Sequence, residues 1–216
     1  MRISGFLKFS MLGVILMLLP ACNGILDGIY DEKPEGDLTG FLKFNEETGR
    51  GTVYVDATSY TRWVYLDLHN RNYDTINVYS EQPEPDQWDI AVHRYDAKTN
   101  GGAVLQTEMT EFDVLVQSGK IPEGEYVQDV MGKITIDMSN MMDGNIIYAD
   151  SFINEELCLW LDVNTNSMPP IYTLSNKIYV VRLKDDTYAA VRLTNFIGES
   201  SGKGFLTIDY IYPLDF

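Results

Sequence analysis

The sequence predicts a mainly β fold: a single compact all-β domain of antiparallel meanders with few or no long helices. Apolar and polar residues alternate in the last forty residues, 177–216, as they do in strands with one face on a core. Turn residues at 184–186 and 198–204 separate three such runs, and these links are too short for a helical crossover. No convincing helical pattern covers ten or more residues. The chain therefore ends in a three-stranded meander, one face of which carries Tyr179, Val181, Leu183, Ala189, Val191, Leu193, Leu206, Ile208, Tyr210 and Tyr212.

The start of the chain has the composition of a lipoprotein signal peptide, which we assign to residues 1–21. Arg2 and Lys8 give a basic start, and the apolar run that follows is too short for a bilayer span, which takes ~20 residues. The stretch 19–22 (LPAC) resembles a bacterial lipobox, which implies cleavage before Cys22 and diacylation of its thiol. The alternative is an ordinary secreted protein that is cut nearby, with Cys22 incidental.

Residues 22–37 are predicted to be a lipidated N-terminus and a flexible tether, because they are polar, acidic and contain glycine. Acidic residues soon after a lipidated cysteine also resemble the surface-export signals of some Gram-negative lipoproteins. The chain has two cysteines, so a lipidated Cys22 leaves no partner for a disulfide. Cys158 is therefore predicted to be a small buried hydrophobe.

The charge of the chain excludes some partners. Removing residues 1–21 takes away two basic side chains and no acidic one, which leaves 14 Lys and Arg against 32 Asp and Glu, a formal charge of −18. Such a chain has little affinity for nucleic acid or for anionic lipid. We therefore expect contact with the membrane through the lipid anchor only, and no nucleic-acid partner.

Residues 38–216 are enough for one domain with a core of its own. Alternating or β-rich runs predict strands at 41–44, 51–56, 63–68, 75–79, 88–95, 104–106, 112–117, 146–149 and 157–163. Polar and glycine-containing segments predict turns or loops at 45–50, 96–102, 141–145 and 164–170. The stretch 130–139 is less regular.

Signals for catalysis are weak, so the sequence does not indicate an enzyme. The two histidines, His69 and His93, both lie in strand-like runs, where a lone histidine is usually a hydrogen-bonded structural residue. No metalloprotease HExxH pair, GxSxG turn or phosphate-binding glycine loop is present. Among 32 carboxylates, chance pairs are certain, and none is singled out.

Methionines in polar, irregular segments are the unusual feature of this sequence. Met138, Met141 and Met142 surround one predicted loop, and Met168 lies in another. Methionine normally fills gaps in a core, so apolar side chains folded back under the loops are one interpretation. The other is ligation, because a thioether is a soft ligand that suits copper(I) or the axial position of haem iron.

Three stretches resemble the HmuY family of haem-binding lipoproteins: 88–102 (WDIAVHRYDAKTNGG), 177–196 (KIYVVRLKDDTYAAVRLTNF) and 202–214 (GKGFLTIDYIYPL). The resemblance implies a compact, mostly β domain at 38–216 whose loops hold one haem b (iron protoporphyrin IX) as cargo. It also implies a surface lipoprotein of the outer membrane that takes haem from host haemoproteins or other carriers. The haem would then pass to an outer-membrane haem receptor.

The resemblance further implies two axial ligands from separate loops, a histidine pair in some members and a methionine pair in others. No histidine follows residue 93, so the methionine pair is the expected one. By resemblance, Met168 is one axial ligand and Met141 the other, with Met142 as a close rival. The porphyrin then needs apolar walls, for which the neighbouring candidates are Ile146, Ile147, Tyr148, Ile171 and Tyr172.

Two other functions stay open on the sequence. A surface lipoprotein could bind glycan or protein, without haem, through strand faces rich in its 14 tyrosines and three tryptophans. An enzyme that acts on a periplasmic substrate is the third. Addition of haemin to the protein distinguishes them, because haem binding sharpens and shifts the Soret band.

The lipobox makes the first testable prediction. The variant Cys22→Ala removes the thiol that would carry the acyl chains, so the protein should move from the membrane fraction to the soluble fraction. Fractionation of cells that express each form measures this. A variant that stays in the membrane to the same extent as the unaltered protein would contradict the lipobox assignment.

Overall fold

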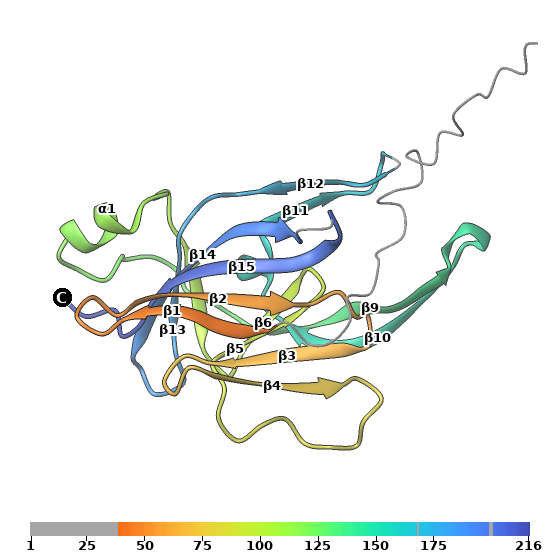
Figure 1. Ribbon diagram of the computed structural model, residues 1–216, viewed down its shortest axis with the longest axis horizontal. Coiled ribbons are helices and arrows are strands. Elements are labelled where there is room, and N and C mark those ends of the chain that lie inside the picture. Colours follow the sequence, from red (N-terminus) through yellow and green to blue (C-terminus); the bar gives the residue numbers. More distant parts are fainter. Residues whose placement is uncertain (1–38, 168, 199–200) are drawn as a thin grey trace, which may run out of the picture.

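The computed structural model describes residues 39–167, 169–198 and 201–216, and within them the chain is mainly β. Antiparallel strands make up most of this part, and only two short α-helices and one 3₁₀ turn join them (Figure 1). The strands are β1 (Gly40–Asn45), β2 (Arg50–Asp56), β3 (Arg62–Asp67), β4 (Asn72–Asn77), β5 (Ile90–His93), β6 (Asp96–Thr99), β7 (Ala103–Gln106), β8 (Val127–Gln128), β9 (Val130–Asn140), β10 (Asn145–Ile153), β11 (Leu161–Asn164), β12 (Ile171–Leu174), β13 (Tyr179–Arg182), β14 (Tyr188–Ile197) and β15 (Lys203–Ile211). The helical segments are α1 (Phe112–Gln117), η1 (Met141–Asp143) and α2 (Glu155–Cys158).

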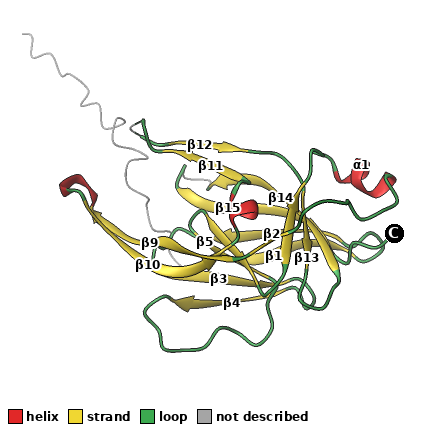
Figure 2. Cartoon of the chain, turned by 180° about the vertical axis from the view of Figure 1, so that it is seen from behind, coloured by secondary structure: helices red, strands yellow, loops and turns green. Residues whose placement is uncertain are grey.

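The strands form two larger sheets and two hairpin ribbons (Figure 2). One sheet has seven strands in the order β1-β2-β15-β14-β13-β7-β8, and the other has four in the order β4-β3-β5-β6. The ribbons are the hairpins β9–β10 and β11–β12. The predicted C-terminal meander is confirmed, because β13, β14 and β15 are consecutive neighbours in the larger sheet.

Strand β15, the last strand of the chain, pairs with a strand from the beginning of the described residues. It pairs with β14 on one side and with β2 on the other, where Ile208 is opposite Val53 and Leu206 is opposite Val55. These side chains belong to the main core, together with the face of the meander expected from the alternation in sequence. Burial of each large aliphatic side chain contributes about 1.5–3 kcal/mol, so this core dominates the stability of the fold.

The opposite face of the meander is also covered, and the cover is helix α1. Ile178, Val180 and Ile211 pack there against Phe112 and Leu115 of α1. The prediction of a strand at 112–117 is therefore wrong. The buried residues of this segment are three apart, as on one side of a helix, whereas the valines that complete the alternation are exposed.

Two further predictions are wrong for local reasons. A turn was predicted at 96–102, but residues 96–99 form strand β6. The chain already turns at Arg94, whose φ is 51°. The predicted strand at 157–163 contains the end of α2 before β11 begins. The buried side chain of Asn154 caps this helix by accepting a hydrogen bond of 2.9 Å from the backbone N–H of Leu157.

The remaining predicted elements agree with the structure within a few residues. Strands β1, β2 and β3 lie where 41–44, 51–56 and 63–68 were predicted, and the irregular stretch 130–139 is the long strand β9. The predicted loop 141–145 is the tip of the β9–β10 hairpin. The signal peptide, the tether and Met168 lie outside the described residues. In the described part of the chain, no helix has both the length and the apolar character needed to cross a membrane.

The β9–β10 hairpin is fixed at its base and extends away from the domain at its tip (Figure 1). At the base, Ile134 and Ile136 are buried in a third apolar cluster with Trp63 of β3 and Trp88, which precedes β5. Beyond this cluster both strands continue to the 3₁₀ turn. The tip is thus held in place by the packing of its base.

The main core predicts a large difference between two leucine variants. Leu206→Ala deletes a side chain with 0% exposure, so the free energy of unfolding should fall by about 2–5 kcal/mol. The matched control is Leu42→Ala on edge strand β1, where the leucine is 60% exposed and the loss should stay below about 0.5 kcal/mol. Urea unfolding measures both. Equal losses in the two variants would contradict the described core.

Candidate functional site

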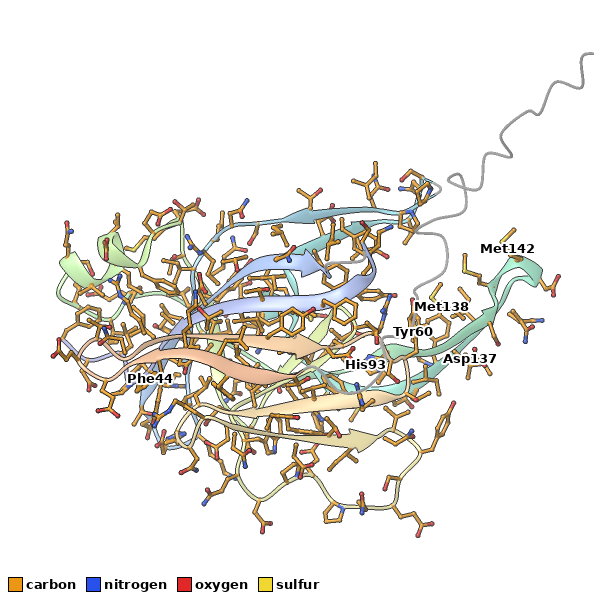
Figure 3. The ribbon with its side chains drawn as sticks, in the orientation of Figure 1. Phe44, Tyr60, His93, Asp137, Met138 and Met142 are labelled. Carbon is orange, nitrogen blue, oxygen red and sulfur yellow. The ribbon has the colours of Figure 1, made fainter. Side chains whose placement is uncertain are left out.

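The first candidate loop forms the tip of the β9–β10 hairpin. Met141 and Met142 begin the 3₁₀ turn, which ends at Gly144 with a φ of 77°, in the left-handed region that suits glycine. Met141 is half-buried and Met142 is 80% exposed. In Figure 3, Met138 and Met142 lie along one edge of the hairpin and Asp137 along the other. The fold therefore presents thioethers at the end of a projecting hairpin.

The second candidate loop joins β11 to β12, and residues 165–167, 169 and 170 confirm it as a loop. Met168 itself is outside the described residues, so its assignment stays a prediction. On β12, Ile171 is exposed, whereas the ring of Tyr172 stacks on Phe196 with the ring centroids 5.1 Å apart. Both views of the chain place this loop and the β9–β10 tip at the same end of the molecule, opposite α1 (Figures 1 and 2).

Exposed apolar side chains concentrate on the β9–β10 hairpin. Six of the 14 exposed large hydrophobic residues of the described chain lie on this one hairpin: Val130, Met131, Met142, Ile147, Tyr148 and Phe152. Ile146 is half-buried beside them. Exposed apolar surface on this scale is unfavourable in water unless a ligand or a partner covers it. Of the predicted walls, Ile147 and Tyr148 are thus exposed on this hairpin and Ile146 is half-buried there, whereas Ile171 is exposed on β12 of the other hairpin.

His93 is a structural residue, as its setting in the sequence predicts. Its side chain is fully buried at the end of β5. Nε2 lies 2.7 Å from the backbone oxygen of Tyr60, and Nδ1 lies 3.3 Å from a carboxylate oxygen of Asp96. The ring also packs against Trp63, with 5.2 Å between the centroids. Both nitrogens are thus engaged within the fold and face no solvent-accessible ligand.

Cys158 and the three tryptophans belong to the interior of the fold, whereas His69 does not. Cys158 packs at the edge of the main core, and burial raises the pKa of its thiol to about 12, so it is not a nucleophile at neutral pH. Trp63, Trp88 and Trp160 are all buried, so these side chains do not form an exposed aromatic face. His69 differs from the predicted strand setting, because it lies in the turn after β3 with a partly exposed ring.

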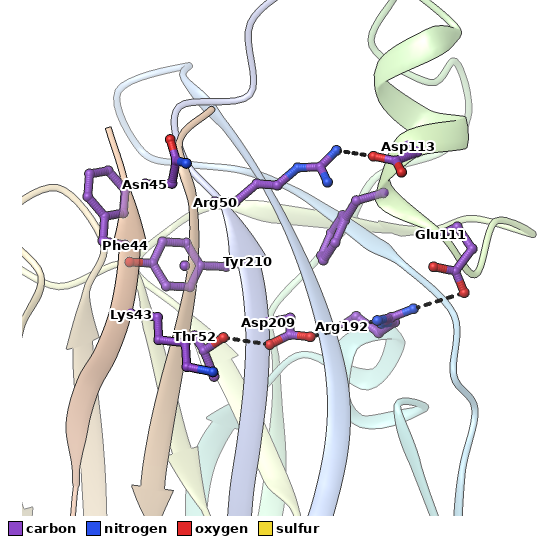
Figure 4. Close-up of a pocket in the computed structure, with 12 residues that line it drawn as sticks. Lys43, Phe44, Asn45, Arg50, Thr52, Glu111, Asp113, Arg192, Asp209 and Tyr210 are labelled. Carbon is purple, nitrogen blue, oxygen red and sulfur yellow. Dashed lines mark hydrogen bonds and ion pairs between the residues drawn. The ribbon is translucent and has the colours of Figure 1, made fainter. Parts of the chain in front are cut away.

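Two hollows lie away from the candidate loops. The larger, of about 420 Å³, lies between the β1–β2 hairpin and α1 (Figure 4). Arg50 contacts Asp113 across it at 2.5 Å, and Arg192 lies 3.5 Å from Glu111, so these ion pairs fasten α1 to the sheet. The smaller, of about 260 Å³, lies beside β3 and β4. None of the predicted binding residues lines either hollow.

Comparison with protein families gives a match over most of the described chain. Residues 59–210 match the family model described as HmuY protein. This segment contains both histidines, the β9–β10 hairpin and the β11–β12 loop. No curated protein sequence matches the chain.

Several solved structures also resemble this chain. A candidate HmuY-like haem-binding protein from Bacteroides vulgatus is 57% identical, covers 82% of this chain and 99% of its own, and superposes with a TM-score of 0.78. A candidate lipoprotein from Bacteroides fragilis is 47% identical over 84% of this chain and 100% of its own, with a TM-score of 0.79. The apo HmuY analogue of Tannerella forsythia is 23% identical over 83% of this chain and 97% of its own, with a TM-score of 0.64, and shows a shared fold.

The setting of His93 predicts a loss of stability when its ring is removed. His93→Ala leaves the half-buried carbonyl of Tyr60 without its partner and opens a cavity where a fully buried ring was, so the free energy of unfolding should fall by about 2 kcal/mol or more. Urea unfolding measures the change. A loss below about 0.5 kcal/mol, the range of ordinary surface substitutions, would contradict a structural role.

Proposed function

Because this chain belongs to the HmuY protein family, we propose that it binds haem b as cargo between the tips of its two projecting hairpins. The observation that carries the proposal is the exposure of Met142, Ile147 and Tyr148 in the outer half of the hairpin that bears the loop methionines. The 57% identical protein from Bacteroides vulgatus, described as HmuY-like and haem-binding, supports the choice of ligand.

Met168 and either Met141 or Met142 are the proposed axial ligands. The described residues fit such a ligand set in two respects. The 3₁₀ turn presents two adjacent thioethers at the tip of a hairpin, and the loop that carries Met168 lies at the same end of the molecule. A thioether is a weak but established axial ligand of haem iron. Met142 is the more exposed of the two, and so the more accessible to a ligand, whereas Met141 is half-buried, and so the better held in place. Each of the two is therefore a candidate ligand.

The apolar surface supplies the larger share of the proposed affinity. Burial of apolar surface contributes roughly 25 cal/mol per Å², and a porphyrin has two large apolar faces. Ile146, Ile147 and Tyr148 on β10 and Ile171 on β12 are the proposed walls. Tyr172 already stacks on Phe196, so it would support the wall from the side of the core. The propionates are proposed to face solvent, since the chain is strongly acidic.

The proposed role is capture and transfer without catalysis. The fold supports this, because His93 is buried and engaged on both nitrogens and the pKa of the Cys158 thiol is raised to about 12. We propose that the protein is a lipoprotein of the outer membrane, anchored through Cys22 at the cell surface. There it would accept haem from host haemoproteins or other carriers and deliver it to an outer-membrane haem receptor.

The methionine assignment gives a direct test. Met168→Ala and the double variant Met141→Ala/Met142→Ala should each weaken haemin binding by about tenfold or more and shift the Soret band, because each removes one axial bond. The fold should be retained, since these side chains lie in loops. Titration with haemin, followed by absorbance, measures affinity and band position together.

Two controls separate ligation from general damage. Met131→Ala removes an exposed methionine near the base of the same hairpin, about 30 Å along the strand from the tip at ~3.3 Å per residue, and should leave the spectrum unchanged. His93→Ala should also leave the Soret position unchanged although it lowers stability. Loop variants with an unaltered spectrum, together with loss of the band in His93→Ala, would overturn the methionine assignment.

A further inference from the structure

In the described part of the chain, one cluster brings a histidine and two carboxylates within reach of a single ion. Asp67 ends strand β3, His69 follows in the β3–β4 turn, and Asp89 immediately precedes β5. One oxygen of each aspartate and one ring nitrogen of His69 all lie within 4.8 Å of one another. Both aspartates are buried, whereas the ring of His69 is 37% exposed. The cluster therefore has a closed inner side and an opening to solvent.

The orientation of the His69 ring is the strongest indication of a cation. Nε2 lies 3.0 Å from Oδ2 of Asp185 in the β13–β14 turn, and Nδ1 lies 3.1 Å from Oδ2 of Asp89. A neutral imidazole has only one N–H to donate. If Nε2 donates to Asp185, the lone pair of Nδ1 faces the carboxylate of Asp89. Two acceptors at this distance need a proton or a cation between them, which is a second proton on His69 or Asp89, or a metal ion.

The surroundings match a metal site in two ways. Histidine ligands of metals commonly donate their other N–H to a carboxylate, as His69 can to Asp185. Two ligand atoms that each lie ~2.1 Å from one ion are themselves about 3.0–3.4 Å apart in octahedral or tetrahedral geometry, which matches the separation of Nδ1 from the Asp89 oxygen.

Both carboxylates are held in place by neutral donors. The backbone N–H of Leu68 donates to Oδ2 of Asp89 at 2.7 Å. Asn70 donates to Asp67 through its backbone at 2.9 Å and through its side chain at 2.7 Å. These bonds fix the positions of the oxygens but do not cancel their charge. Buried carboxylates without a neutralising charge are unfavourable, and a divalent cation would supply one.

We propose that Asp67, His69 and Asp89 bind a divalent first-row transition metal ion, with Zn²⁺ or Mn²⁺ as the chemical class and solvent completing the coordination. Imidazole with carboxylates suits these ions better than Ca²⁺ or Mg²⁺, which take oxygen ligands only. The site lies at the end of β3, away from the tip of the β9–β10 hairpin (Figure 1). Through the contact of His69 with Asp185, the bound ion would connect the four-stranded sheet to the seven-stranded sheet.

The experiment is calorimetric titration of the metal-free, haem-free full-length chain in detergent with ZnCl₂, and separately with MnCl₂ and CaCl₂, at pH 7.5. One Zn²⁺ or Mn²⁺ ion should bind per chain, and Zn²⁺ should raise the unfolding temperature. His69→Gln should weaken Zn²⁺ binding at least tenfold and abolish that rise. Asp185→Asn keeps the three ligands and changes only the positioning of His69, so its loss of affinity should be smaller than that of His69→Gln.

The matched control is Asp74→Asn, which removes an exposed carboxylate of neighbouring strand β4 and should leave Zn²⁺ binding unchanged. Circular dichroism at 20 °C verifies that each variant is folded before titration. Absence of Zn²⁺ and Mn²⁺ binding at 1 mM, or Zn²⁺ binding unaltered in His69→Gln, would overturn the proposal. Ca²⁺ binding that survives His69→Gln, without a Zn²⁺ or Mn²⁺ site, would likewise overturn it by showing a purely oxygen site.

Discussion

The pairing of β15 with β2 is the constraint on which the rest of the structure depends. Seven residue pairs, from Phe205 opposite Asp56 to Ile211 opposite Arg50, join the C-terminal meander to the N-terminal hairpin in one sheet. A slip of one residue would turn Leu206 and Ile208 out of the main core, so the register is fixed by burial as well as by backbone hydrogen bonds. Helix α1 then covers the other face of the same sheet.

The well-packed core of this sheet stabilises the fold enough for a projecting hairpin to leave apolar side chains exposed to water. The β9–β10 hairpin is anchored where Ile134 and Ile136 pack against Trp63 and Trp88. Its outer half exposes Met142, Ile147 and Tyr148, and its base also exposes apolar side chains, among them Met131 and Phe152. A stable core can tolerate such exposure, and a ligand that covers it regains the free energy of burial. The exposed thioether and apolar side chains of the outer half of this hairpin are the physical basis of the proposed haem site.

The sequence predicts the meander well because alternation over long runs has one structural solution. It fails at 112–117, where Phe112 and Leu115 follow a helical period that six residues are too few to reveal. The helix at 155–158 had a signal in the Asn-Glu-Glu start, since asparagine caps helices and acidic residues favour the first turn. The loop methionines were visible in sequence, but the cluster around His69 was not. Asp89 and Asp185 reach that ring only through tertiary pairing of distant segments.

The most direct measurement for the central claim is hydrogen–deuterium exchange of the full-length chain with and without one equivalent of haemin. Haem held between the hairpin tips should slow the exchange of backbone amides at 138–147 and 165–171 and leave α1 unchanged. Protection that is confined to α1 and the β1–β2 hairpin, around the larger hollow, would place the ligand at the wrong end of the molecule and contradict the account.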